Sequence, residues 1–143
     1  SPSATAALWS LERLNDNPLY QALGIEITLI EDRRCQSQLR PSPAACWPLA
    51  TQPHGGILFT QMDTTMATAV LGAFEPGKGN CTTIDLSIQY LAPAVGDVFE
   101  CTAHVVGGGG RVWFLRGETV DSAGNLVAAA QGSFRVFRAH GNA

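Results

Sequence analysis

Basic residues are scarce in this sequence, and lysine is almost absent. Only Lys78 is a lysine; the other basic residues are arginines, in a chain of 143 residues with a formal net charge of −3. A protein that binds duplex nucleic acid needs a broad basic surface, which this composition does not supply, so no nucleic-acid partner is expected. Arginine holds phosphate oxygens with a planar fork that lysine lacks, so a local anion site remains compatible with this composition.

Membrane-spanning segments and paired cysteines are lacking as well. No apolar run is long enough to cross a bilayer, and no basic leader precedes an apolar stretch, which predicts a cytoplasmic protein without a membrane partner. The cysteines, Cys35, Cys46, Cys81 and Cys101, form no CxxC pair. Since the chain is not a small cysteine-dense scaffold, they are predicted to be thiols in a reducing compartment rather than disulfides.

What is present is an apolar chain of moderate length. Hydrophobic residues make up 45% of it and charged residues 15%, a balance that excludes a disordered protein. A domain of roughly 150 residues buries about 68–70% of the surface that its unfolded chain exposes. No internal repeat or long linker is visible, so residues 1–143 are predicted to form one domain.

The beginning of the chain, residues 1–23, predicts short helical segments. Leucines recur at helical spacing between residues 8 and 14. Asn17 and Pro18 then open a second helical turn, and Gly24 closes it. Asparagine before a helix, proline at its first position and glycine after its end are the preferred residues at these places.

Alternating apolar and polar residues predict strands on both sides of a central apolar segment. A proline-rich loop over residues 41–53 separates the first two strands from this segment, and four strands follow it. Strands joined by short turns favour an antiparallel meander. In the first strand after the segment, Ile84, Leu86, Ile88 and Tyr90 are expected on one face. The predicted strands cover residues 25–29, 33–40, 84–90, 99–105, 111–121 and 126–137.

The central segment, residues 54–74, predicts a long helix. From Gly55 to Phe74, apolar side chains cover almost all of its faces, so the helix must be buried on most sides. One apolar helix and a long antiparallel sheet predict an α+β domain in which the sheet curls around the helix. The outer face or the edges of the sheet then need cover, most simply from a second copy of the chain.

Asp63 is the only ionisable side chain between Gly55 and Phe74. A carboxylate on a buried helix is costly unless it is hydrogen-bonded, solvated through a cleft or functional. A structural acid would be held by Thr64, Thr65 or a neighbouring arginine. We favour a catalytic role, because carboxylates in such surroundings concentrate in clefts that carry out chemistry.

Two glycines, Gly55 and Gly56, stand where this helix begins. They leave backbone N–H groups uncovered, which suit a carbonyl oxygen that gains negative charge; tight packing is the alternative reason for glycine. Gly55 and Asp63 are eight residues apart, which is roughly 12 Å along a helix. One reacting atom cannot lie about 3 Å from both. If the two groups cooperate, they must come from different subunits of a dimer with two equal sites.

Four stretches resemble, in order and spacing, the hotdog-fold thioesterases, and in particular the acyl-CoA thioesterases of the phenylacetic-acid pathway (PaaI-like) type. They are HGGILFTQMD from His54, CTTIDLSIQYLAPAVGD from Cys81, GGGGRVWF from Gly107 and DSAGNLVAAAQGSFRVF from Asp121. The resemblance covers most of the chain from Pro53 onward.

The resemblance implies a hotdog fold and an enzyme that hydrolyses an acyl-CoA thioester to a free acid and coenzyme A. By this resemblance, the Gly55 N–H polarises the thioester carbonyl, and Asp63 of the partner subunit acts as general base or nucleophile; the sequence leaves these two roles open. Thr83 holds the water or the carboxylate, and His54 orients the glycines. Coenzyme A belongs to the substrate, so no cofactor is expected. A homodimer, assembled into a homotetramer, is expected.

Substrate contacts are implied at two places. At the helix start they involve His54 and Gly56. At the glycine turn that begins at Gly107, Gly110 and Arg111 would meet the coenzyme A phosphates through backbone N–H groups and a guanidinium. From the sequence alone, an ordinary hairpin tip is the alternative.

Other kinds of site receive no support. The three histidines lack the spacing of paired ligands, so no metal is expected. No GxSxG element indicates a serine nucleophile, and Cys81 is interpreted as a core thiol. We expect Arg135 and Arg138 to be solvated strand ends.

One position departs from the family pattern. Relatives often carry Asn or Gln seven residues before the oxyanion glycine, and here that residue is Pro48. Gln52 or Gln61 could take over this role. The departure favours, as an alternative, a non-catalytic acyl-CoA-binding protein. A hotdog enoyl-CoA hydratase or dehydratase, in which His54 would work with a carboxylate, is a further alternative.

Overall fold

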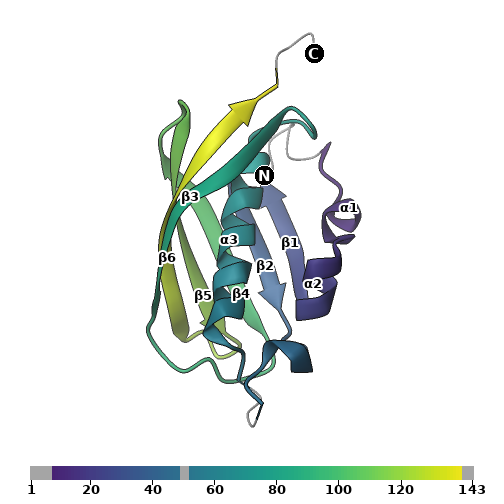
Figure 1. Ribbon diagram of the computed structural model, residues 1–143, viewed down its shortest axis with the longest axis vertical. Coiled ribbons are helices and arrows are strands. Elements are labelled where there is room, and N and C mark those ends of the chain that lie inside the picture. The colour runs from purple at the N-terminus through teal and green to yellow at the C-terminus, as the bar shows by residue number, and fades with distance from the viewer. Residues whose placement is uncertain (1–7, 49–51, 140–143) are drawn as a thin grey trace.

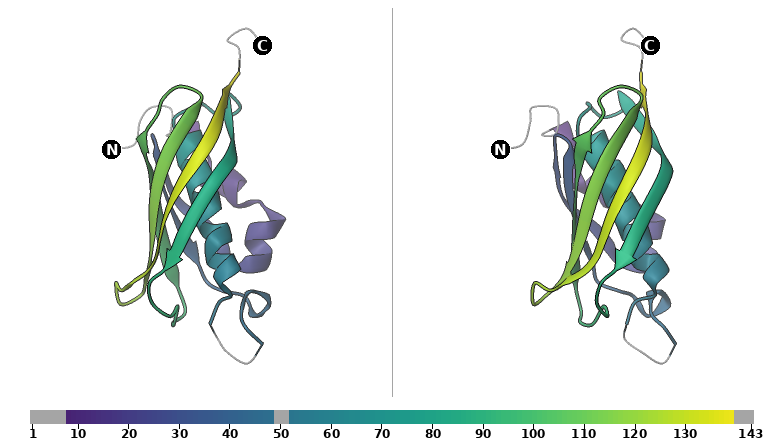
Figure 2. Two further views of the ribbon diagram at one scale, coloured as in Figure 1. Left: turned by 60° about the vertical axis from the view of Figure 1, so that its left-hand side comes forward. Right: turned by 90° about the vertical axis from the view of Figure 1, so that its left-hand side faces the viewer.

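A long helix, α3 (Gly55–Leu71), lies against one face of a six-stranded antiparallel sheet in the computed structural model (Figure 1). The structure describes residues 8–48 and 52–139. The predicted α+β architecture, a sheet curled around one helix, is confirmed (Figure 2). The other elements are α1 (Leu11–Asn15), α2 (Pro18–Leu23), β1 (Ile25–Glu31), β2 (Arg34–Leu39), η2 (Pro43–Ala45), β3 (Gly79–Tyr90), β4 (Phe99–Gly107), β5 (Val112–Asp121) and β6 (Leu126–Arg138).

The strands follow the order β1-β2-β4-β5-β6-β3, and all neighbouring pairs are antiparallel. The predicted meander holds for β4, β5 and β6 but is wrong for β3, which pairs with β6 instead of β4. The connection between β3 and β4 is no tight turn, because residues 91–98 cross beneath one end of the sheet (Figure 1). Strand β3 therefore becomes an edge strand.

Helix α3 ends at Leu71 and not at Phe74 as predicted. Beyond Leu71 the backbone bonds between residues three apart, since the Phe74 N–H donates to Leu71 O at 3.0 Å. Gly72 presses against strand β1, where a Cβ would come within 2.1 Å of Glu31 O. Only a glycine fits this close approach, and the helix stops where the chain passes the sheet.

Glycines on the inner face of the sheet let helix α3 approach closely. A Cβ at Gly117 would lie 2.4 Å from Met62 Sδ, and one at Gly132 would lie 2.9 Å from Met66 Sδ. Both methionines are wholly buried, and their flexible thioethers fill the space between helix and sheet. The main core gathers around them: Ile27, Cys35, Ala69, Val70, Cys101, Ala103, Trp113, Leu115, Phe134 and Val136.

Cys35, Cys81 and Cys101 are thiols, as predicted. Burial raises the pKa of Cys101 to about 11 and also raises the pKa of Cys35. Both thiols are therefore protonated at neutral pH and act as small core side chains.

The two edge strands of the sheet, β1 and β3, differ in whether their outer backbone groups have hydrogen-bond partners. At β1, the side chain of Asn15 pairs with the backbone of Ile27 as a strand would, donating to Ile27 O at 2.9 Å and accepting from its N–H at 2.7 Å. No described segment pairs with the outer edge of β3. An uncovered edge of this length is a template for another strand.

The side of helix α3 that faces away from the sheet also stays open in the single chain. Phe59 is 36% exposed there, Gly56 is exposed and Asp63 is half-buried. We call Gly56, Phe59 and Asp63 the open helix face. None of the helices in residues 8–48 and 52–139 has the length and hydrophobicity that a membrane crossing would need.

Candidate active site

The carboxylate of Asp63 is held by a threonine of the neighbouring edge strand. Thr83 Oγ1 donates a hydrogen bond of 2.6 Å to Asp63 Oδ1. Thr65, one structural partner that we considered from the sequence, bonds Ser37 Oγ at 2.7 Å inside the core instead, and no described arginine pairs with Asp63. Asp63 is thus a half-buried carboxylate oriented by one hydroxyl group.

A β-bulge in β3 directs Thr83 at the helix. The pairing with β6 matches Thr83 to Phe134 and Asp85 to Ser133, so that Ile84 is the extra residue. Bulges commonly re-aim side chains in this way. Ile84 itself is 56% exposed.

Cys81 lies on the same strand, close to Asp63. Its thiol donates a weak hydrogen bond to Ala67 O at 3.7 Å. Burial, and to a smaller degree the charge of Asp63, raises the pKa of Cys81 to about 11. The nucleophilic thiolate is therefore scarce at neutral pH, which agrees with its interpretation as a core thiol.

His54 caps the start of helix α3. Its Nδ1 accepts a hydrogen bond of 2.9 Å from the Gly56 N–H, and this contact fixes the glycine pair relative to the imidazole. The Gly55 N–H has no hydrogen-bond acceptor among the described residues. Gly55 thus offers the free donor at this helix start, where the helix dipole favours negative charge.

Tyr90 belongs to this site, although the sequence did not single it out for function. Its hydroxyl donates to Gly55 O at 2.6 Å, and a Cβ at Gly55 would lie 3.3 Å from its ring. The sequence feature that could have pointed to Tyr90 was its place at the end of the alternating apolar residues of β3. The helix residue that it meets depends on the strand register.

The free donor and the carboxylate stand apart on one helix. Gly55 begins α3 and Asp63 lies at its middle, about 12 Å away by helix geometry. A single chain therefore cannot bring both groups to one reacting atom.

The missing amide at Pro48 is not replaced by Gln61. That side chain is wholly buried, and its Nε2 donates to Ser37 Oγ (3.2 Å) and Phe99 O (3.1 Å) on the sheet side of the helix. Gln52 is partly exposed near the helix start, and its role stays a prediction.

The glycine turn between β4 and β5 is fastened by an arginine. Arg138 donates to Gly110 O at 3.2 Å and to Gly109 O at 3.1 Å, and its guanidinium lies 5.7 Å from the Trp113 ring centroid. Arg135 donates to Val136 O at 2.6 Å. Arg138 is an exposed strand end, as predicted, because it is the last residue of β6, whereas Arg135 is half-buried within the strand. Both side chains also brace the backbone.

Arg111 is exposed at this turn, and its guanidinium has no partner among the described residues. The turn lies at the end of the molecule where α3 finishes, opposite the end where Gly55 begins it (Figure 1). In one chain, Arg111 and Gly55 are therefore far apart.

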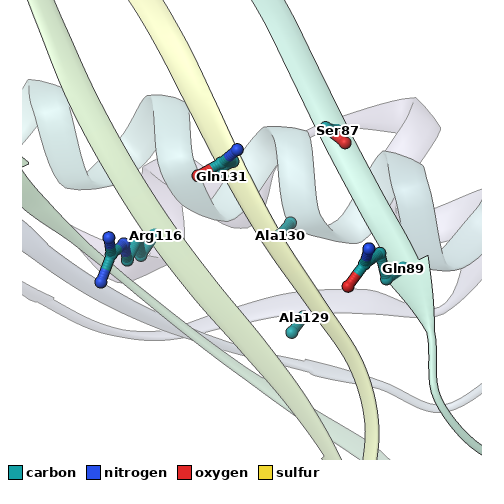
Figure 3. A pocket seen from close by; sticks show the side chains of 6 residues that line it. All are labelled: Ser87, Gln89, Arg116, Ala129, Ala130 and Gln131. Atoms are coloured by element: carbon teal, nitrogen blue, oxygen red, sulfur yellow. The ribbon is translucent and has the colours of Figure 1, made fainter.

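A hollow on the outer face of the sheet involves none of these groups. Ser87, Gln89, Arg116 and Gln131 surround it on strands β3, β5 and β6 (Figure 3). No three His, Cys, Asp or Glu side chains in residues 8–48 and 52–139 are grouped to hold a metal ion, and His140 lies outside these ranges.

A curled antiparallel sheet wrapped around one long helix is the hotdog fold. Residues 54–128 match the family model of the thioesterase superfamily. The chain belongs to this superfamily, which places it among the thioester hydrolases.

Individual proteins agree with this assignment. A Halobacterium salinarum protein with a provisional esterase name is 41% identical over 92 residues, which are 59% of this chain and 60% of that protein. The medium/long-chain acyl-CoA thioesterase YigI of Escherichia coli K12 is 24% identical over 83% of this chain and 85% of its own length. The E. coli PaaI protein from the phenylacetic acid degradation operon has a TM-score of 0.81 at 23% identity, over 99% of this chain and 98% of that one. The predicted hotdog fold and PaaI-like resemblance are confirmed.

Proposed function

We propose that this protein is an acyl-CoA thioesterase whose active site is shared between two subunits. The Gly55 N–H of one subunit would polarise the thioester carbonyl, and Asp63 of the partner subunit would activate the attacking water. The observation that carries the proposal is the hydrogen bond from Thr83 to Asp63. It orients a carboxylate on the open helix face, beside a strand edge that a second copy can cover.

Hydrolysis needs few groups. Water adds to the carbonyl carbon while Asp63 takes its proton, and the Gly55 N–H stabilises the oxyanion. The C–S bond then breaks, and Asp63 returns the proton to the leaving sulfur, which releases the thiol of coenzyme A. In the alternative route, Asp63 itself attacks the carbonyl carbon, and the C–S bond breaks so that coenzyme A leaves as a thiolate, which takes a proton from water. Water then hydrolyses the mixed anhydride, which releases the free acid and restores the carboxylate. Thr83 serves both routes by fixing the Asp63 oxygens.

The dimer follows from the two uncovered features. Pairing of β3 edges would extend the sheet, and a two-fold axis would set the two α3 helices antiparallel, bringing each Gly55 toward the Asp63 of the partner subunit. We further propose that two dimers form a homotetramer through the outer sheet face, where Phe114 is 49% and Val106 48% exposed.

The substrate class is supported by the relatives and by the glycine turn. YigI is named for medium- and long-chain acyl-CoA. Arg111 and the exposed backbone of Gly110 are suited to coenzyme A phosphates, since an unpaired guanidinium prefers such oxygens. We also propose that the protein acts in the cytoplasm, where buried thiols such as Cys35 and Cys101 persist in reduced form.

Pro48, which stands where relatives often carry Asn or Gln, supports a second candidate function, the binding of acyl-CoA without turnover. Neither Pro48 nor the buried Gln61 offers an amide to the site. The hydratase reading is less favoured, because His54 Nδ1 already accepts from the Gly56 N–H. Tight binding of an intact acyl-CoA with no release of thiol would establish the binding function.

The Gly55 donor can be deleted without removing the helix. Proline is well suited to the first helical position, and His54 has φ −61° and ψ 140°, the extended conformation that precedes proline. Gly55→Pro removes the N–H, whereas the matched Gly55→Ala adds a similar Cβ near Tyr90 and keeps it. We expect kcat to fall by about 10²–10³-fold in the proline variant and far less in the alanine variant. Equal losses in both would reject the oxyanion role.

A further inference from the structure

Trp47 is a large apolar side chain exposed beside the start of helix α3. Half of it, 50%, is exposed. Its ring packs on the imidazole of His54, with ring centroids 4.4 Å apart and planes tilted by 34°. Because His54 caps the helix that begins at Gly55, the indole adjoins the place proposed for the thioester carbonyl.

The loop that carries Trp47 is fastened to the helix start. The Trp47 N–H donates to Gln52 O at 3.0 Å, and the His54 N–H donates to Ala45 O at 2.8 Å. A β-bridge joins Cys46 to Pro53 between these bonds. These contacts fix the indole relative to Gly55.

A groove of about 380 Å³ opens at Trp47. Three prolines, Pro41, Pro43 and Pro48, line it with Trp47, together with Asp97 from the loop before β4. Such a volume is in the range of small-ligand sites. The proline and indole walls are apolar and rigid, so they suit an uncharged hydrocarbon group.

Asp97 gives this apolar groove a negative charge. The carboxylate is exposed and forms no ion pair with a described residue. It therefore repels a second carboxylate or a phosphate brought close to it. Arg111, the arginine proposed to meet phosphate, lies instead at the glycine turn.

We propose that this groove receives the acyl group of the thioester, with Trp47 as its apolar wall and Asp97 as the residue that discriminates against acyl groups ending in a carboxylate. The inference rests on the proposed function, since a thioester carbonyl held by the Gly55 N–H places its acyl group next to Trp47. Asp97 acts here as a specificity residue and takes no part in the chemistry.

The test compares hexanoyl-CoA with adipoyl-CoA, which have the same chain length but differ by a terminal carboxylate. We expect the wild type to prefer hexanoyl-CoA. In Asp97→Asn, kcat/KM for adipoyl-CoA should rise about fivefold, and the gain should shrink at high salt. Hexanoyl-CoA should change less than about twofold, as expected for a neutral chain. The matched control is Asp85→Asn, which removes the same charge from the outer sheet face.

The apolar wall is tested in parallel. Trp47→Ala should lower kcat/KM for hexanoyl-CoA by about tenfold and affect acetyl-CoA much less, because the shorter group buries little area. Leu19→Ala serves as the control, since Leu19 is 51% exposed on α2. Equal losses for both substrates would make Trp47 only a support of His54, and an adipoyl gain shared by Asp85→Asn would dismiss Asp97; either result overturns the inference.

Two further arms separate this inference from the proposed function. If no thioester is hydrolysed, calorimetric binding of S-hexyl-CoA and S-carboxypentyl-CoA, which cannot be hydrolysed, still tests the groove with the same variants. Hexanoyl- and adipoyl-pantetheine lack the nucleotide. The Asp97→Asn effect should persist with them, and its loss would assign the groove to the nucleotide and contradict the inference.

Discussion

At the scale of single residues, the site depends on how Asp63 is oriented. The bond from Thr83 fixes one carboxylate oxygen at 2.6 Å, and a fixed carboxylate reaches a transition state with little reorganisation. The neighbouring thiol of Cys81 is kept protonated by burial, which raises its pKa to about 11. In the proposed mechanism, Asp63 is therefore the group that activates the water or attacks the thioester.

Thr83→Val keeps the shape of the side chain and removes the donor. We expect kcat to fall about 10-fold or more, since a hydrogen bond to a charged group contributes roughly 1.5–3 kcal/mol. KM should change little. Steady-state kinetics check this, with Thr82→Val, an exposed neighbour on the same strand, as control. Equal kcat values for the two variants would remove Thr83 from the site.

Asp63 could be found from the sequence because it is the only charge on an apolar helix. Thr83 came with the family resemblance. The contact of Tyr90 with Gly55 and the inward direction of Gln61 could not be foreseen, because they depend on strand register and on the rotation of α3 about its axis. The bulge at Ile84 shifts that register, and no residue in the sequence of β3 predicts the bulge.

At the scale of elements, the glycine turn is the part most easily separated from the chemistry. Arg138 braces its carbonyl groups, which leaves the guanidinium of Arg111 to meet a ligand. The elements themselves were largely predictable from alternation and turn residues, apart from the early end of α3 and the start of β3, which lies at Gly79 and not at Ile84. The strand order was not, since alternation says nothing about which strand β3 joins.

Arg111→Ala tests the phosphate contact. We expect KM for an acyl-CoA to rise about 5–20-fold, as for the loss of a charge-assisted contact. The matching acyl-pantetheine, which lacks the nucleotide, should be unaffected. Steady-state kinetics with both substrates measure the two KM values. A similar rise in KM for both would mean that Arg111 supports the fold of the turn.

The β1 edge gives a prediction about stability. Asn15→Ala removes both hydrogen bonds to the Ile27 backbone, and we expect the free energy of unfolding to drop by about 1–3 kcal/mol. Urea denaturation measures it. Asn17→Ala, which removes only the α2 cap, should cost about 1 kcal/mol. A neutral Asn15→Ala would show that the edge needs no such partner.

At the scale of the whole molecule, the single chain of 15.1 kDa would be an incomplete enzyme in the proposed mechanism. The Gly55 N–H and the Asp63 carboxylate lie at different positions along helix α3. The open helix face and the β3 edge are both uncovered. Two-fold assembly accounts for all three features at once. The sequence could suggest this arrangement only through the spacing of eight residues from Gly55 to Asp63.

Dimer and activity should therefore be lost together. Phe59→Asp places a charge on the open helix face, and we expect dissociation to a monomer with hydrolysis reduced at least about 100-fold, because each site would lose half of its groups. Sedimentation and turnover are measured on the same sample. Phe114→Asp, on the outer sheet face, should leave an active dimer. An active Phe59→Asp monomer would be incompatible with a shared site.

The most direct measurement mixes two inactive variants. Asp63→Asn and Gly55→Pro homodimers are prepared separately, each about 10²–10⁴-fold impaired, and are then allowed to exchange subunits. Every mixed dimer would contain one intact pair of groups, so activity should return to about a quarter of the wild-type level. If exchange is complete and activity does not return, Gly55 and Asp63 do not meet across the dimer, and the proposed mechanism is wrong.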